Sequence, residues 1–369
     1  MRIFSPLTLL PASLLLLAGT SLADRIFTVE GSTIDDVTIS KESLNEVEYK
    51  TSSGRTVKTI PSYEVLDTVF DKLPEQLDSA EAALGEERFV DAINDINEFL
   101  GRFGEKPPRT APWSVPYAYN RLIEIYMGMG DYPHVVEAAD VLLAKAADSR
   151  YAPLAHMAKI DALNLMSDEA NLATAVGGFS TFVESNSLQA RWRLEAELRG
   201  VLFDRSLQGA KRRAKLQEVA NSAGSESPLV RNRATVAIGE SLVGERKLEE
   251  AQKLFEKIVK DPQADPSILA AAHTGLGDCL YQRGKNLKDQ GQDGDEDIRA
   301  ASLHFLRVVV LYPDQEQYVP RALFYAGRTF QELGGEDGER RAQALYSKLI
   351  RTYPESKSAK EARSFRRRG

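Results

Sequence analysis

Two stretches near the C-terminus repeat one pattern of small, aromatic and aliphatic residues. Each has Ala, an aromatic residue, an aliphatic residue and Pro at successive spacings of four, three and five residues. These residues are Ala301, Phe305, Val308 and Pro313, followed by Ala342, Tyr346, Leu349 and Pro354. The two sets lie 41 positions apart (342 minus 301), and each ends in Tyr-Pro. Because apolar residues three and four positions apart share one face of a helix, the pattern predicts a stacked array of helical units.

The same helical period extends over most of the chain. From Leu73 onward the spacing of apolar residues changes from two to about 3.6. We expect two antiparallel helices in 73–103, a second pair in 117–146, four helices in the irregular stretch 150–226, and clear pairs from 229 onward. A proline-rich loop after the first pair carries Trp113, which either packs against the helices or is an exposed contact. We favour packing, because Trp usually buries most of its area.

Specific positions in this helical part resemble the tetratricopeptide repeat (TPR) family. Gly130, Asp131 and Tyr132 stand at the turn before the second helix of a pair, where that family places Gly-Asp-Tyr. Further matches are Gly239, Leu242, Leu248, Ala251, Phe255, Gly277 and Gly327, with Pro262 one residue early. The resemblance is specific in 117–146 and 229–356. It implies an α-solenoid of antiparallel helix pairs over 73–369, degenerate in 150–226, in which each pair buries its spare apolar face against the next.

Residues 24–72 have a different pattern, that of short β-strands. Five segments rich in β-branched and aromatic residues alternate with turns that contain Gly and Ser. We predict a strongly bent antiparallel sheet or a small barrel, with one helical turn at Pro61 and Ser62 before the last strand. The strand rhythm resembles that of SH3-like and Sm-like modules, which usually bind or dock. The predicted fold is thus mainly α, a TPR-like solenoid preceded by a small β-barrel-like module.

Residues 1–23 have the features of a secretory signal peptide. Arg2 gives a basic start, an apolar run follows, and Ser21 and Ala23 are small residues at the −3 and −1 positions. We expect cleavage between Ala23 and Asp24; the alternative is an uncleaved anchor. The mature chain should carry no transmembrane segment and be periplasmic or extracellular. Cys279 is the only cysteine, which excludes an internal disulfide and suits a bacterial periplasm.

The charge and the motifs argue for a binding protein rather than an enzyme. The net charge is −7, whereas a surface for nucleic acid or anionic lipid needs a basic face. No Gly-rich phosphate loop follows a predicted strand, and no nucleophile motif is present. We therefore predict no catalytic residue and no cofactor, and we expect protein or peptide partners without nucleic acid.

Two groups of residues have metal-ligating side chains. The segment from Asp289 to Asp297 resembles part of a calcium loop, but Gly291 and Ala300 stand where oxygen ligands are needed. The four histidines, His134, His156, His273 and His304, form neither an HExxH motif nor an i, i+4 pair, although His273 and His304 fall in one repeat and can approach each other. We predict no metal site, with weak ion binding by the acidic segment as the alternative.

The acidic segment belongs to one of two insertions relative to the family. The distance from Gly277 to Ala301 is about twice that of the family, and a few extra residues also separate Gly327 from Ala342. Both insertions fall at the turn inside a helix pair, so they should project from the same edge of the array. They either extend the helices or form mobile acidic loops.

A curved helical array offers a groove that usually takes an extended or helical peptide. The groove-facing positions of the family lie on the first helix of each pair. Carried over by register, they are Tyr117, Asn120, Glu124, Arg233, Glu240, Asp278, Tyr281, Arg321, Arg328 and Gln331. Arg321 and Arg328 lie about two turns apart on one face. They either clasp an acidic or C-terminal carboxylate group of a partner, or pair with acidic residues of neighbouring helices.

The resemblance implies a non-enzymatic scaffold for protein–protein interactions. The Tyr-Pro endings are similar to those of the Tol-associated cell-division coordinator and of the BamD-type outer-membrane assembly component, which implies a role in cell-envelope assembly or maintenance. The chain lacks the lipobox Cys of the second protein and the N-terminal coiled coil of the first. The alternatives are a self-assembling structural envelope protein and a non-catalytic subunit of an envelope enzyme complex. The identity of the partner and the oligomeric state stay open.

Overall fold

The chain forms two compact units in the computed structural model. The structure describes residues 23–29, 31–52, 54, 56–224, 227–261 and 264–366, so the predicted signal segment up to residue 22, and also Pro262, lie outside the described residues. Unit 1 comprises the described residues up to 128, with 132–162 and 187–189; unit 2 comprises 129–131, 163–186 and the described residues from 190 onward. Among the described residues, no helix is long and apolar enough to cross a membrane.

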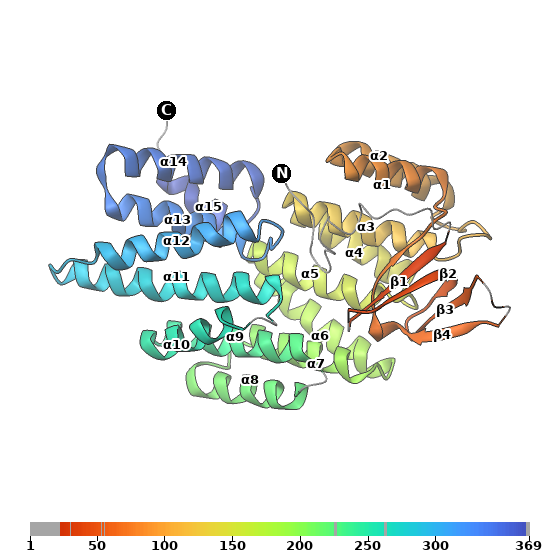
Figure 1. Cartoon of the computed structure of the whole chain (residues 1–369), viewed down its shortest axis with the longest axis horizontal. Helices are drawn as coiled ribbons and strands as arrows, with labels where there is room; N and C mark the ends of the chain where they lie inside the picture. Colours follow the sequence, from red (N-terminus) through yellow and green to blue (C-terminus); the bar gives the residue numbers. More distant parts are fainter. Residues whose placement is uncertain are drawn as a thin grey trace. The chain divides into compact units, whose positions relative to one another are not determined.

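Unit 1 begins with a five-stranded antiparallel sheet (Figure 1). Its strands are β1 (Asp24–Thr28), β2 (Thr33–Glu42), β3 (Glu46–Thr51), β4 (Lys58–Pro61) and β5 (Val65–Val69), in the order β4-β3-β2-β1-β5. Alternate side chains such as Val37, Ile39 and Val47 are buried, which gives the sheet one apolar face. The predicted helical turn is present at Ser62–Glu64. Within the described residues β4 and β5 are the two edges of the sheet, so the predicted β module is an open sheet rather than a closed barrel.

Five helices follow the sheet along the chain. They are α1 (Glu75–Gly85), α2 (Phe89–Phe103), α3 (Ser114–Met129), α4 (Tyr132–Lys145) and α5 (Ala152–Met166). The helix pairs predicted in 73–103 and 117–146 are therefore confirmed. At the turn between α3 and α4, Gly130 has a φ of +71°, a left-handed conformation that glycine adopts without steric cost.

Two sets of contacts hold the sheet against the helices of unit 1. Phe70, directly after β5, stacks on Trp113 with ring centroids 3.4 Å apart, and Trp113 is only 5% exposed. Glu42 of β2 forms a buried ion pair with Arg150, with 2.6 Å between Oε1 and Nε. Tyr151 donates a second hydrogen bond of 2.8 Å to the same carboxylate. The prediction that Trp113 packs inside the protein is confirmed, and the sheet and these helices share one core.

Unit 2 is a stack of antiparallel helices. The helices that follow α5 are α6 (Glu169–Ser185), α7 (Ala190–Phe203), α8 (Gly209–Ala223), α9 (Pro228–Gly244), α10 (Leu248–Val259), α11 (Pro266–Asp289), α12 (Asp295–Leu311), α13 (Val319–Leu333), α14 (Gly335–Thr352) and α15 (Lys357–Phe365). In Figure 1, α11 to α14 lie side by side in chain order. The four helices predicted in 150–226 correspond to α5–α8, and the predicted final helix is α15. The fold is mainly α and built from helix pairs, as predicted.

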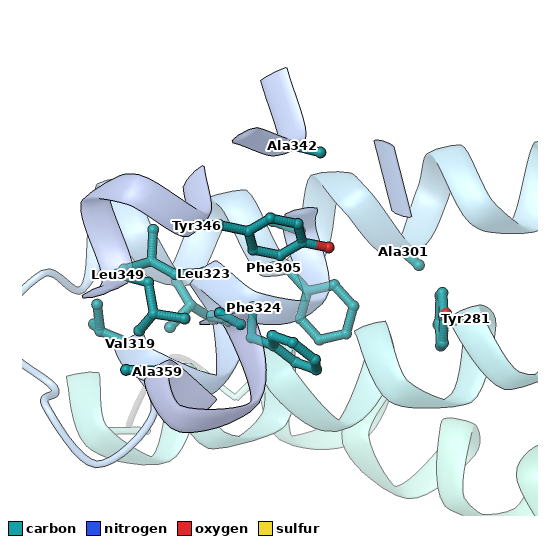
Figure 2. Packing of buried hydrophobic residues seen from close by; sticks show 14 of the residues in the cluster. Tyr281, Ala301, Phe305, Val319, Leu323, Phe324, Ala342, Tyr346, Leu349 and Ala359 are labelled. Carbon is teal, nitrogen blue, oxygen red and sulfur yellow. The ribbon is translucent and has the colours of Figure 1, made fainter. Parts of the chain in front are cut away.

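In three helix pairs, an aromatic ring of the second helix packs directly on a glycine of the first. The contacts are Gly239 with Phe255, Gly277 with Phe305, and Gly327 with Tyr346. A Cβ atom at Gly277 would lie 2.6 Å from the ring of Phe305, so a larger residue would force the helices apart. Figure 2 shows Phe305 and Tyr346 in the shared core of the last two pairs, where both rings are fully buried.

Both insertions extend helices rather than forming loops. The longer one continues α11 and α12 to a short turn, and the shorter one forms the start of α14. The two extended helices approach closely where Gly284 faces Gly294, since a Cβ atom at Gly284 would lie 2.8 Å from the carbonyl oxygen of Gly294. Arg283 forms a two-pronged ion pair with Asp297, at 2.6 and 2.7 Å. Three acidic residues of the insertion, Asp295, Glu296 and Asp297, lie in the first turn of α12, where the helix dipole favours negative charge.

Candidate functional site

Five of the predicted groove residues lie on neighbouring first helices of the repeat pairs in unit 2. Glu240 is on α9, Asp278 and Tyr281 are on α11, and Arg321 and Arg328 are on α13. Residues three and seven positions apart share one side of a helix. Arg321 of α13 contacts Asp278 of α11, and both act on the charge of Glu240 of α9. We call the surface that these side chains share the α9–α11–α13 face.

Arg321 is already neutralised by a carboxylate of the neighbouring helix. Its Nη2 atom lies 2.9 Å from Oδ2 of Asp278, and its guanidinium lies 4.9 Å from the ring centre of Tyr325. The attraction of Asp278 raises the pKa of Arg321 above its usual range. Burial raises the pKa of the Asp278 carboxyl, and Arg321 opposes that rise. Pairing with an acidic residue of a neighbouring helix, one of the two predicted alternatives, is thus what Arg321 does in the free protein.

Glu240 adds a second carboxylate beside this ion pair. The residue is exposed, yet the protein atoms around it desolvate its carboxylate and raise its pKa. Arg321 lowers the pKa of Glu240, and Asp278 raises it. Arg321 thus acts on two carboxylates, and Arg212 also lowers the pKa of Glu240.

Arg328 is held more loosely than Arg321. Its guanidinium is 3.5 Å from Glu332, one turn later on α13, and Lys285 of α11 is 3.6 Å from the same carboxylate oxygen. The hydroxyl of Tyr281 is also 3.5 Å from that oxygen. These distances exceed the usual length of a strong hydrogen bond. Three donors therefore converge on one acceptor without a short bond to it, while the ring of Phe365 lies 4.4 Å from the guanidinium of Arg328.

Two other predicted groove residues of unit 2 are engaged in holding helices together. Gln331 accepts a hydrogen bond of 2.7 Å from the hydroxyl of Tyr346. Arg233 of α9 donates to the buried Glu195 of α7 at 3.1 Å. Although burial opposes the ionisation of Glu195, Arg233 and Arg199 hold the pKa of its carboxyl below the usual range. Gln331 and Arg233 thus each join two helices of unit 2.

The three predicted groove residues of unit 1 face other parts of that unit. Tyr117 is buried; its hydroxyl donates to Glu81 of α1 at 2.7 Å, and its ring lies edge-on to Phe70 at 5.6 Å. Asn120 donates to Glu124 at 2.7 Å. At Tyr117, the segment after β5 thus covers part of the side of α3 from which the resemblance predicts peptide binding.

Several residues of these networks were not predicted from the sequence. In unit 1, Arg121 donates hydrogen bonds to Glu81, which lies 40 positions earlier in the chain, and to Glu124, three positions later. Tyr325 and Glu332 follow Arg321 and Arg328 by four residues each, so the i, i+4 spacing on the predicted helix could have identified both as neighbours of the arginines. Long-range partners such as Glu81 could not be identified from local spacing in the sequence.

Of the candidate metal ligands, two histidines lie close together, whereas the acidic segment forms an ion pair with a lysine. His273 and His304 do approach each other, with 3.0 Å between their Nδ1 atoms. In the acidic segment, Asp295 pairs with Lys288 at 2.8 Å. Across the part of the chain that the structure describes, no group of three or more His, Cys, Asp or Glu side chains is arranged to hold a metal ion.

Comparison with known proteins identifies one repeat of the array. Residues 321–356, which cover nearly all of α13 and all of α14, match the family described as Tetratricopeptide repeat. No curated protein matches the chain. The repeat match and the stacked helix pairs together indicate a helical-repeat protein of the kind that serves as a scaffold for protein–protein interactions. Arg321, Arg328 and Gln331 all lie inside the matched segment.

Proposed function

We propose that the protein is a non-enzymatic scaffold that binds a partner protein on the α9–α11–α13 face. An acidic side chain or a C-terminal carboxylate of the partner binds at Arg328. The observation that carries this assignment is the convergence of Arg328, Lys285 and Tyr281 on Glu332 at 3.5–3.6 Å. Lys285 also lies 3.4 Å from Asp289, so within the described residues each of these contacts is longer than a strong hydrogen bond. An incoming carboxylate gains charge-assisted hydrogen bonds from these groups. Arg321 is the poorer anion site, because Asp278 and Glu240 flank it.

Variants of the two arginines test the proposed site. Arg328→Gln removes one charge-assisted hydrogen bond and should weaken partner binding about 10- to 100-fold. The matched control is Arg321→Gln on the same helix face, for which we expect less than a threefold change. The partner is captured from an envelope extract with the wild-type chain, and its dissociation constant is then measured for all three proteins by calorimetry. Equal affinities of the wild type and the Arg328→Gln variant would remove the anion site from the proposal.

The proposal includes export and a role in the bacterial cell envelope. In support of export, Asp24 is the first residue of β1, and its carboxylate accepts the backbone N–H groups of Ile39 (2.7 Å) and Asp71 (2.9 Å). A chain cleaved after Ala23 therefore keeps the whole sheet. The envelope role rests on the Tyr-Pro repeat endings. The intact mass of the protein from a periplasmic fraction should correspond to a chain that starts at Asp24, and a mass that retains residues 1–23 would contradict export with cleavage.

A further inference from the structure

A pair of histidines joins the two helices of the repeat with the longer insertion. His273 of α11 and His304 of α12 lie with their Nδ1 atoms 3.0 Å apart and their ring centroids 5.2 Å apart. His273 is 6% exposed, whereas His304 is partly exposed. The two rings are thus packed between helices, and solvent reaches the pair on the side of His304.

The surroundings keep both rings uncharged at neutral pH. Burial lowers the pKa of each histidine to about 4, and Arg307 of α12 acts in the same direction on both. Glu256 of α10 acts in the opposite direction on His304. The ring of Tyr312 lies 6.0 Å from that of His273 and completes the set of groups around the pair. Each neutral imidazole carries one lone pair, and in the present contact one Nδ1 donates its proton to the other. Both Nδ1 atoms can bind one ion when the donor ring moves its proton to Nε2, a tautomer change without net loss of a proton.

We propose that His273 and His304 form a binding site for a divalent transition-metal ion of the zinc or copper class. Imidazole is a preferred ligand of these ions. Two nitrogens bound to one tetrahedral zinc ion at about 2.0–2.1 Å lie about 3.3–3.4 Å apart. Two nitrogens in adjacent positions of a square-planar ion lie about 2.8–2.9 Å apart at the same bond length. The observed 3.0 Å falls between these values, so metal entry requires a displacement of a few tenths of an ångström.

The site has two protein ligands and is completed by water. Within the described residues no third side chain is arranged as a ligand, so the remaining positions of the ion are open. One ligand comes from α11 and the other from α12, so the ion links the two helices of this repeat. Binding stabilises the folded state, because the pair is assembled only when the helices are packed. This site is separate from the α9–α11–α13 face and does not depend on partner binding.

Zinc binding to the full chain tests the proposal directly. The protein is purified without a polyhistidine tag, treated with a chelator and titrated with Zn²⁺ by calorimetry. We expect one ion per chain and, at about 100-fold excess over the dissociation constant, a rise in Tm of roughly 5 °C that a chelator reverses. The NMR signals of the ring nitrogens of His273 and His304 should shift in the folded wild-type protein, a readout that does not require a variant to fold.

A matched pair of variants locates the ion. His304→Asn removes one ligand, and His134→Asn removes an exposed histidine of unit 1 that stacks on Tyr126, so both variants retain three histidines. We expect His304→Asn to lose the Tm rise and His134→Asn to keep it. Equal zinc responses of the two variants, or unshifted ring nitrogens of His273 and His304, would overturn the proposal.

Discussion

Glycine at three equivalent positions lets an aromatic ring lie on the backbone of the facing helix. Gly327 meets Tyr346 in the last pair, and Gly277 meets Phe305 in the pair before it. The ring fills the space that a side chain on the first helix would otherwise occupy. Phe305 also stacks on Tyr325 of the next pair, with ring centroids 5.6 Å apart. The repeat pattern at these residues therefore reflects how the helices pack and does not indicate what the protein binds.

Gly327→Ala tests this packing. The added Cβ overlaps the ring of Tyr346, which is fully buried. We expect unit 2 to lose about 1–3 kcal/mol of stability. The control is Gly244→Ala at the end of α9, where a Cβ meets no atom within 4 Å; it should be neutral or stabilise by about 0.4–1 kcal/mol. Urea unfolding followed by circular dichroism compares the two, and matching midpoints would show that the close approach is not needed.

Among the elements, the sheet and the helices of unit 1 are joined by a buried ion pair. Glu42 of β2 and Arg150 before α5 are almost inaccessible, with side chains 0% and 4% exposed. Thr68 and Tyr151 donate to the same carboxylate at 3.0 and 2.8 Å, so its oxygens are satisfied. A buried charge of this kind is tolerated only while its partner is present.

Arg150→Met should therefore destabilise unit 1 strongly. The change leaves the Glu42 carboxylate buried without its counter-charge, which costs about 3–5 kcal/mol. Lys41→Met is the control, because Lys41 pairs with Glu48 at 3.1 Å on the exposed side of the sheet, and such pairs contribute at most about 1 kcal/mol. Thermal unfolding of both variants measures the difference. A small effect of Arg150→Met would mean that the sheet is not anchored through this residue.

On the scale of the whole molecule, the chain divides into two units, and the β module lies in the first. The sheet belongs to the same compact unit as the helices up to residue 162. Its contacts with Trp113, Tyr117 and Arg150 cover residues that would otherwise be exposed. The β module is thus part of the core of unit 1 rather than a freely tethered domain.

Fragments test this division. Residues 24–162 contain the sheet together with the helices that it covers, so this fragment should fold and resist proteolysis. Residues 73–162 lack the sheet and should be protease-sensitive, because Trp113, Tyr117 and Arg150 lose their partners. Limited proteolysis and circular dichroism distinguish the two fragments. A stable, folded 73–162 would show that the helices do not need the sheet.

Local patterns in the sequence determined the helices, the strands and the positions of the repeat packing. These features depend on residues a few positions apart, such as Gly130 at its turn or the +4, +3 spacing that ends at Val308, so the sequence alone is sufficient to predict them. The predicted groove residues lie on the expected helices, but the partners of several of them are not local. Arg321 meets Asp278 across 43 positions, and Arg150 meets Glu42 across 108.

Only the tertiary structure decided which of these side chains are engaged and which are available. Arg321 and Arg328 have the same residue type and the same helix face, yet one is bound at 2.9 Å and the other has a partner at 3.5 Å. Likewise, the 3.0 Å contact between His273 and His304 depends on how α11 packs against α12. Burial and long-range pairing set the charge that a side chain presents, and neither quantity is contained in the local spacing of residues.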